Sequence, residues 1–178
     1  ISSTAGARVG GLIGWTSGYD KVDDGPVDTV VIITNCSVEN CVITAAGSVG
    51  GLIGHAGCNS AAYHTITNNR VVDCTLHSTD DGGWRVGVVV GTANIGEITI
   101  SGTISDKNVL TQVDKAALEG QSDLYGRFVP YDTGKLTIDG VPIPTVYNSD
   151  ELRAELKKDV ATINIVLGGD CTLNITPW

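Results

Sequence analysis

Short runs of apolar, β-branched residues separated by small polar residues dominate the first two thirds of the chain. The first three runs cover residues 8–14, 29–36 and 38–44, and glycine, asparagine, aspartate or serine stands near their ends. Runs of this kind with turn residues at their ends are typical of strands. Nothing in this part has the 3.6-residue period of an amphipathic helix. The pattern therefore predicts three short β-strands in each stretch of this kind.

The first of these runs recurs along the chain. The hexapeptide Val-Gly-Gly-Leu-Ile-Gly occurs at 9–14 and again at 49–54, and a divergent copy, Val-Gly-Val-Val-Val-Gly, stands at 86–91. A unit of three short strands cannot bury its own apolar face, whereas stacked copies bury it against one another. The repeat therefore predicts an all-β fold, a right-handed parallel β-helix with three short strands per coil.

A second motif follows each hexapeptide and sets the expected register. The segment 33–43 aligns on 66–76 without gaps, and a third copy runs from 98 to 110 after a one-residue slip near Gly102. Stacking in register makes equivalent residues neighbours about 4.8 Å apart. Three ladders are expected: Val9, Val49 and Val86; Ile33, Ile66 and Ile100; and Val38, Val71 and Ile104.

Two further pairs follow from the same alignment. Asn35 and Asn68 are expected to stack at a corner, where side-chain amides can bond along the column. Cys41 and Cys74 are also expected to be neighbours, and we interpret them as two thiols because parallel side chains fit a disulfide dihedral badly. The chain has five cysteines. An odd number leaves at least one of them unpaired within the chain.

The hexapeptide at 9–14 and the following Ile-Thr-Asn-Cys-Ser-Val at 33–38 carry a family resemblance. Together they resemble the GLUG-type repeat of large bacterial surface proteins, over about residues 5–110. The resemblance implies an extracellular, cell-surface location and a repeat scaffold of the adhesin or surface-fibre kind. It implies no particular ligand, because one scaffold can serve many functions.

The last third of the chain departs from the repeat. We expect repeat coils and an exit segment over residues 1–128, and a capping or second-module segment over 129–178. In the second part the sequence predicts one helix at about 149–158, opened by Asn148 or Ser149 as a cap and presenting Leu152 and Leu156 on one face. Further elements are a short strand and turn over 136–141, interrupted pairing at Pro142 and Pro144, and strands at 162–167 and 171–175 around a turn at 168–170.

The net charge of −9 argues against binding to nucleic acid, because the phosphate backbone would be repelled. No run of 18 apolar residues occurs, so direct membrane insertion is not expected. The partners expected are a host or bacterial surface glycan or protein. End-to-end self-association of coils in a surface fibre is a further hypothesis.

The candidate binding residues stand in two insertions between the repeat motifs, because insertions on a solenoid often carry function. The first insertion covers 15–28 and the second lies between Leu76 and Val86. An exposed aromatic ring beside carboxylates can stack on a sugar and accept bonds from its hydroxyls. The candidates for such a site are Trp15, Tyr19, Asp20, Asp23, Asp24, Asp80, Asp81 and Trp84.

The same acidic loop raises a calcium alternative. Asp20, Asp23, Asp24 and Asp28 could offer oxygens to Ca²⁺. They lack the spacing of an EF-hand loop, and we expect no cofactor.

Catalysis and metal binding are the remaining alternatives. A polysaccharide lyase or hydrolase would need converging acids and bases, and the candidates are Asp73, His77, Asp80 and Asp81. These residues form no convincing constellation, so we expect no enzyme. A metal site at His55, His64 and His77 is not expected either. His64 aligns with Val31 and Ile98 at a strand position, and His55 and His77 are placed beside turns.

Overall fold

The computed structural model describes residues 1–3, 7–18, 29–58, 62–80, 85–94, 97–113, 118–119, 125–128, 135–143, 145–148, 152, 156–157 and 166–172. The described strands form six sheets. Sheet A holds β1 (Ser2–Ser3), β6 (Val42–Ala45), β11 (Thr75–Ser78), β16 (Val109–Gln112) and β17 (Leu118–Glu119). Sheet B holds β2 (Val9–Gly10), β7 (Val49–Gly50) and β12 (Val86–Gly87).

The remaining sheets follow the same order along the chain. Sheet C holds β3 (Ile13–Gly18), β8 (Ile53–Cys58), β13 (Val90–Asn94) and β18 (Tyr125–Phe128). Sheet D holds β4 (Thr29–Thr34), β9 (Ala62–Thr67), β14 (Glu97–Ser101), β19 (Lys135–Ile138) and β20 (Val141–Ile143). Sheet E holds β5 (Ser37–Glu39), β10 (Arg70–Val72) and β15 (Ile104–Asp106). Sheet F holds β21 (Thr145–Asn148) and β22 (Val166–Thr172).

The parallel β-solenoid expected from the repeat is confirmed, but its coil has five strands where three were expected. Strands β2–β6, β7–β11 and β12–β16 make successive coils, and each strand pairs in parallel with the strand five places further on. The extra strands arise because two of the expected runs bend. The first run divides into β2 and β3, and the third divides at Asn40 into β5 and β6.

Two columns of left-handed residues make the sharp corners of the coil. The corner after sheet D is formed by residues with positive φ, namely Asn35 (55°), Asn68 (54°), Gly102 (59°) and Asp139 (47°). The corner after sheet E is formed by Asn40 (54°), Asp73 (52°) and Lys107 (54°). Asparagine, aspartate and glycine adopt this conformation more readily than other residues, which explains their recurrence at one position per coil.

Two of the three expected ladders are confirmed, and the third is wrong in its last member. Val9, Val49 and Val86 are register partners in sheet B. Ile33, Ile66 and Ile100 are register partners in sheet D. Val38 pairs with Val71, but the next partner of Val71 is Ser105, while Ile104 pairs with Arg70 and is 53% exposed.

The expected slip near Gly102 is therefore also wrong. Because Gly102 itself takes the left-handed corner position of Asn68, the alignment continues without a gap.

The amides that bond between coils belong to Asn69 and Asn108, not to the expected pair. Asn35 and Asn68 are exposed at their corner. Asn69, one residue later, is buried; its Oδ1 accepts from the backbone nitrogen of Cys36, and its Nδ2 donates to the carbonyl of Ile33. Asn108 is also buried and bonds to the backbone of Cys74 and Val71 in the same way. The corner residue sets the turn, and the residue after it points inward and satisfies the backbone groups that the turn leaves unpaired.

The interior of the coil is filled mainly by isoleucine, valine, leucine and alanine. Cys36, Cys41 and Cys74 are free thiols, as expected for Cys41 and Cys74. Cys74 is buried in the core cluster, and burial raises the pKa of its thiol. These cysteines serve as small apolar residues of the core.

The glycines of the hexapeptide let neighbouring segments of the coil approach closely, and their φ angles are not in the left-handed region. A β-carbon at Gly11 would meet the side chain of Val38, and one at Gly51 would meet that of Val71. In the third coil the equivalents of Gly51 and Val71 are Val88 and Ser105. The large and small residues have thus exchanged places, which accounts for the divergent hexapeptide at 86–91.

The stack continues past residue 128 into a partial fourth coil. β18 pairs in parallel with β13, and β19 pairs in parallel with β14. Two antiparallel strands then cover sheet edges, β17 against β16 and β20 against β19. Covering an edge hides backbone groups that could otherwise pair with another chain.

The last part of the chain corrects two expectations. Pro142 does lie in a paired strand, the edge strand β20, where its missing N–H is tolerated. In place of the turn expected at 168–170, strand β22 runs through these residues, and its pairing with β21 shifts register between Val146–Leu167 and Asn148–Thr172. Most of the helix expected at 149–158 lies outside the described residues; of the three described ones, Leu152 and Leu156 are helical and Lys157 lies in a turn. The strands expected at 162–167 and 171–175 fall partly outside them as well.

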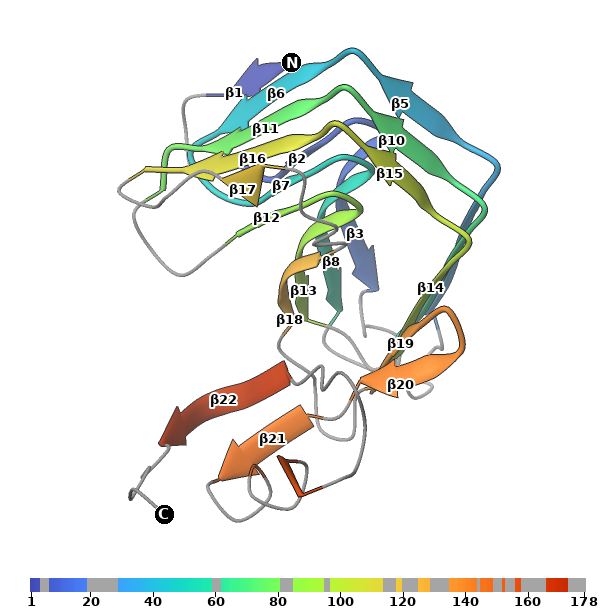
Figure 1. Ribbon diagram of the computed structural model, residues 1–178, viewed down its shortest axis with the longest axis vertical. Helices are drawn as coiled ribbons and strands as arrows, with labels where there is room; N and C mark the ends of the chain where they lie inside the picture. Colours follow the sequence, from blue (N-terminus) through green and yellow to red (C-terminus); the bar gives the residue numbers. More distant parts are fainter. Residues whose placement is uncertain are drawn as a thin grey trace, which may run out of the picture.

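The coil is bent into two arms, as Figure 1 shows. In one arm β11 and β12 run side by side, and in the other β13 descends opposite β14. β12 and β13 therefore meet at an inward angle on the outside of the solenoid. Among the described residues no helix is long and apolar enough to cross a membrane.

Candidate functional site

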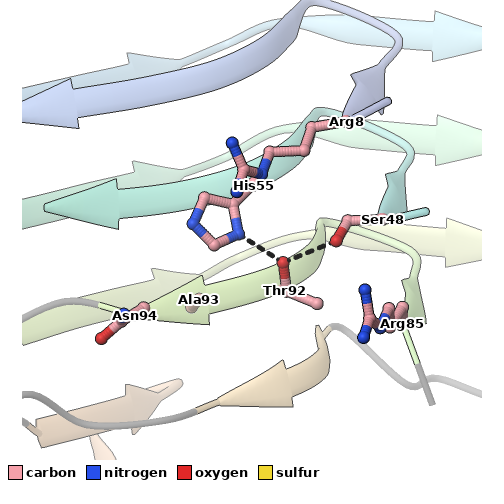
Figure 2. Close-up of a pocket in the computed structure, with 7 residues that line it drawn as sticks. All are labelled: Arg8, Ser48, His55, Arg85, Thr92, Ala93 and Asn94. Atoms are coloured by element: carbon pink, nitrogen blue, oxygen red, sulfur yellow. Dashed lines mark hydrogen bonds between the residues drawn. The ribbon is translucent and has the colours of Figure 1, made fainter. Parts of the chain in front are cut away.

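A hollow of about 240 Å³ lies in the angle between sheets B and C, and we refer to it as the groove. Its lining residues are Arg8, Ser48, His55, Arg85, Thr92, Ala93 and Asn94 (Figure 2). They come from three successive coils. The hollow is therefore a product of stacking and exists in no single repeat.

Two columns of side chains form the walls of the groove. Arg8, Ser48 and Arg85 each stand immediately before the first valine of a hexapeptide, on the sheet B side. On the sheet C side, Trp15, His55 and Thr92 are register partners in β3, β8 and β13. Trp15 is not itself a lining residue; it lies beside the groove, in contact with the lining residues Arg8 and His55.

The first level pairs a cation with an aromatic ring. The guanidinium of Arg8 lies 4.6 Å from the centroid of the Trp15 ring, a cation–π contact. Trp15 also meets the ring of His55 edge-on at a centroid distance of 6.3 Å. The indole nevertheless remains 54% exposed, so one part of it is available to a ligand.

The lower levels are joined by hydrogen bonds, shown as dashed lines in Figure 2. Thr92 Oγ1 lies 2.5 Å from His55 Nδ1 and 2.8 Å from Ser48 Oγ. This chain of bonds holds the imidazole in one orientation and connects the two walls. The groove is therefore held in shape by the scaffold before any ligand arrives.

The charge of the groove comes from its arginines. Burial, reinforced by the charges of Arg8 and Arg85, lowers the pKa of His55 to about 4, so the ring is neutral at pH 7. Arg85 Nη1 forms an ion pair of 2.9 Å with Asp80 Oδ2, whereas Arg8 has no carboxylate partner among the described residues. The groove is a local cationic site on a chain of net charge −9.

Of the candidate residues named from the sequence, the structure describes two. Trp15 stands at the groove as described above, and Asp80 reaches it indirectly, as the ion-pair partner of Arg85. The other candidates lie outside the described residues: Tyr19, Asp20, Asp23, Asp24, Asp81 and Trp84. Asp28, named as a calcium candidate, lies outside them too.

The groove residues that sequence reasoning missed are Arg8, Ser48, His55, Arg85 and Thr92. A signal for them exists in the repeat itself. Arg8, Ser48 and Arg85 precede the same valine of each hexapeptide, and Trp15, His55 and Thr92 follow it at one spacing. The candidates named from the sequence lie in the insertions, whereas this site uses positions that all three copies share.

The remaining catalytic and metal candidates occupy separate environments. His77 lies within β11, not beside a turn, and its Nδ1 is 2.7 Å from Thr111 Oγ1. His55 likewise lies within β8. Asp73 is an exposed corner residue. His64, as expected, is the register partner of Val31 and Ile98.

His64 is a buried polar residue in an apolar ladder. It is 2% exposed; its Nε2 lies 2.8 Å from Thr16 Oγ1, and its Nδ1 has no hydrogen-bond partner. Burial lowers the pKa of His64 to about 4. Folding therefore disfavours the protonated ring, and an unsatisfied buried nitrogen adds a cost.

We expect His64→Val to reduce the loss of stability in acid. Between pH 6.5 and 4 the unfolded chain binds a proton at this position and the folded chain does not, so stability falls as the pH falls through this window. The share of His64 in that fall is about 3 kcal/mol over the whole window. Urea unfolding at pH 7.5 and 4.5 should show a smaller difference in the variant. Ile98→Val, in the same ladder, is the control and should lower stability equally at both pH values.

Comparison with protein-family models, with curated proteins and with solved structures gave no match to this chain.

Proposed function

We propose that the chain is a non-catalytic scaffold domain that binds or presents a ligand on the outside of a bacterial cell. The observation that carries the binding role is the groove built by three stacked coils, together with the exposed Trp15 ring that lies beside it and contacts the lining residue Arg8. The proposed location rests on the resemblance of the hexapeptides and of the motif at 33–38 to GLUG-type repeats.

A carbohydrate is the ligand that this arrangement suits best. An exposed indole offers an apolar face on which a sugar ring can stack, and guanidinium and hydroxyl groups beside it can bond to the sugar's polar atoms. The hollow of about 240 Å³ lies below the range of about 300–1,000 Å³ typical of pockets for drug-sized ligands. It therefore suits one sugar unit of a longer chain.

The non-catalytic part of the proposal rests on where the acids and bases stand. His55 is bonded to Thr92, His77 to Thr111, and Asp80 to Arg85. In the described part of the chain, no group of three histidine, cysteine or acidic side chains comes together. A polysaccharide-cleaving site would need acids converging on the groove.

A glycan array tests the proposal. We expect the domain to bind at least one glycan, and Trp15→Ala to weaken that binding about tenfold or more, because loss of a stacking ring typically costs more than 1 kcal/mol. Trp15→Phe keeps a ring and should retain part of the affinity. Ile32→Ala removes an apolar side chain that is 67% exposed on sheet D, and should change nothing.

The variant Trp84→Ala separates the groove from the second insertion. If Trp84→Ala abolishes binding and Trp15→Ala does not, the ligand binds the insertion and the groove is not the site. If no glycan is bound by the parent domain, the proposal of a carbohydrate-binding scaffold is wrong and a protein ligand takes its place.

End-to-end self-association is a second candidate, favoured by one observation. In the described part of the chain, strands β2, β3, β4 and β5 each have a neighbour on one side only. An uncovered row of strand edges can pair with another chain. A mass that rises with protein concentration in sedimentation would support this role, and a constant monomer mass would contradict it.

A further inference from the structure

We propose that the groove recognises a carboxylated sugar, a uronate unit of an acidic glycan, with Arg8 as the residue that binds the carboxylate. The inference rests on the proposed function and names the chemical class of its ligand. It is drawn from the charges, bonds and exposure of the groove residues.

The first step is that the guanidinium of Arg8 has N–H donors that no described carboxylate uses in an ion pair. Its side chain is exposed, and its contact with Trp15 is a cation–π contact rather than a hydrogen bond to an acceptor, with Cζ 4.6 Å from the ring centroid. A guanidinium has five N–H donors in one plane and binds carboxylates through two parallel hydrogen bonds.

The second step is that Arg8 and Trp15 would act on the same ligand. Arg8 Cζ lies 4.6 Å from the centroid of the Trp15 ring, and both side chains are exposed, so one ligand can reach both. A uronate carries its carboxylate directly on the sugar ring. One such unit could therefore stack on the indole while its carboxylate meets Arg8.

The third step concerns the far end of the groove, where Asp80 partly compensates the positive charge of Arg85. Asp80 bonds to Nη1 of Arg85, and Nε of Arg85 is buried without a hydrogen-bond partner. Arg8 and Arg85 occupy equivalent places two coils apart, with Ser48 between them. The positive charge available to a ligand is thus greatest beside Trp15 and is reduced by Asp80 at the other end.

A neutral His55 completes the argument. Because the imidazole is uncharged at pH 7, it adds hydrogen-bonding capacity to the groove without adding a second strong cation beside Trp15. The groove therefore suits one carboxylate together with sugar hydroxyls, rather than a dense polyanion. A chain of net charge −9 would in addition repel such a polyanion at long range.

The test uses two probes that differ only in charge, a galacturonate trisaccharide and its fully methyl-esterified form. Titration calorimetry at pH 7 should show that the acid binds about tenfold more tightly than the ester, as expected for a charge-assisted pair of hydrogen bonds. Arg8→Gln should remove this preference, so that the acid and the ester bind with equal affinity. A thermal melt checks that the variant is folded.

A second variant predicts a gain, which a merely structural role would not produce. Asp80→Asn removes the carboxylate that neutralises Arg85, so the groove becomes more positive. We expect the acid to bind about threefold more tightly to Asp80→Asn, with no change for the ester. Glu39→Gln, which breaks the other ion pair of the described chain at Arg70, is the control and should alter neither affinity.

The outcomes separate this inference from the proposed function. Equal binding of acid and ester, lost in Trp15→Ala, would overturn the carboxylate inference and leave a carbohydrate-binding groove. Binding of neither probe would overturn the inference also, and the glycan array would then decide the proposed function alone. A preference for the acid that survives in Arg8→Gln would show that Arg8 does not bind the carboxylate.

Discussion

Gly50→Ala is expected to lower the free energy of unfolding by about 4 kcal/mol. A loss this large is typical of a substitution whose added atoms overlap atoms that cannot move. The added β-carbon would overlap the carbonyl oxygen of Ile53 and lie 2.8 Å from the backbone nitrogen of Gly91 in the next coil. These atoms are backbone, so no side chain can rotate away. Urea unfolding followed by circular dichroism measures the loss.

The control for Gly50→Ala is the same substitution at Gly140. That residue has a φ of 79° and nothing within 4 Å of the added carbon, so only backbone strain opposes the change. The strain costs about 1 kcal/mol. If Gly50→Ala costs no more than Gly140→Ala, the second and third coils do not approach each other as described.

Val88→Gly is expected to cost about 3 kcal/mol, because a fully buried valine leaves a cavity and glycine adds backbone entropy to the unfolded chain. The cost should shrink when Ser105→Val is added. That double variant recreates in the third coil the glycine and valine that stand at Gly51 and Val71 in the second.

A double-mutant cycle measures this compensation. We expect a coupling of about 1–2 kcal/mol between Val88→Gly and Ser105→Val, as is typical of residues that share a space. Ser105→Val alone should destabilise the fold, because it places two valines where the other coils have one. Additive effects would show that the two side chains do not share a space.

The solenoid could be predicted because its cause is visible in the chain. Two identical hexapeptides and a gapless second motif fix which residues stack, and most of that register is confirmed. The number of strands could not be predicted in the same way. A run such as 38–44 looks continuous, and only the positive φ at Asn40 divides it into β5 and β6.

The misplaced residues have a common reason. Asn68 and Asn69 are adjacent and identical in type, so composition cannot tell which amide points inward; the left-handed backbone at Asn68 decides it. Ile104 was placed inside because it is apolar, yet the register gives the inward position to Ser105. In this coil the large side chain comes from Val88 instead of from position 105. An alignment that matches apolar residues cannot detect such an exchange.

The groove was missed because its residues share a position but mostly differ in type. Ser48 separates Arg8 from Arg85 in the alignment, and Trp15, His55 and Thr92 are three different residue types. Stacking converts each set into one wall. The binding chemistry arises from the differences between the repeats, whereas the fold arises from their similarities.

The length of the coil varies in some segments and is constant in others. From β4 through β6, every residue of the first coil pairs with the residue 33 positions later, whereas the separation from Val9 to Val49 exceeds that from Val49 to Val86. The extra residues thus stand in the sequence between β3 and β4 and between β11 and β12.

Because the variable residues lie outside the stacked strands, such a domain could change in sequence at little cost in stability. The strands that precede these connections belong to sheets C and A, and the groove lies between sheets B and C. Residues added or deleted there would change what surrounds the groove while leaving its stacked walls and the core unchanged, as exposed connections tolerate. Related domains could therefore acquire new binding specificities while keeping the same fold.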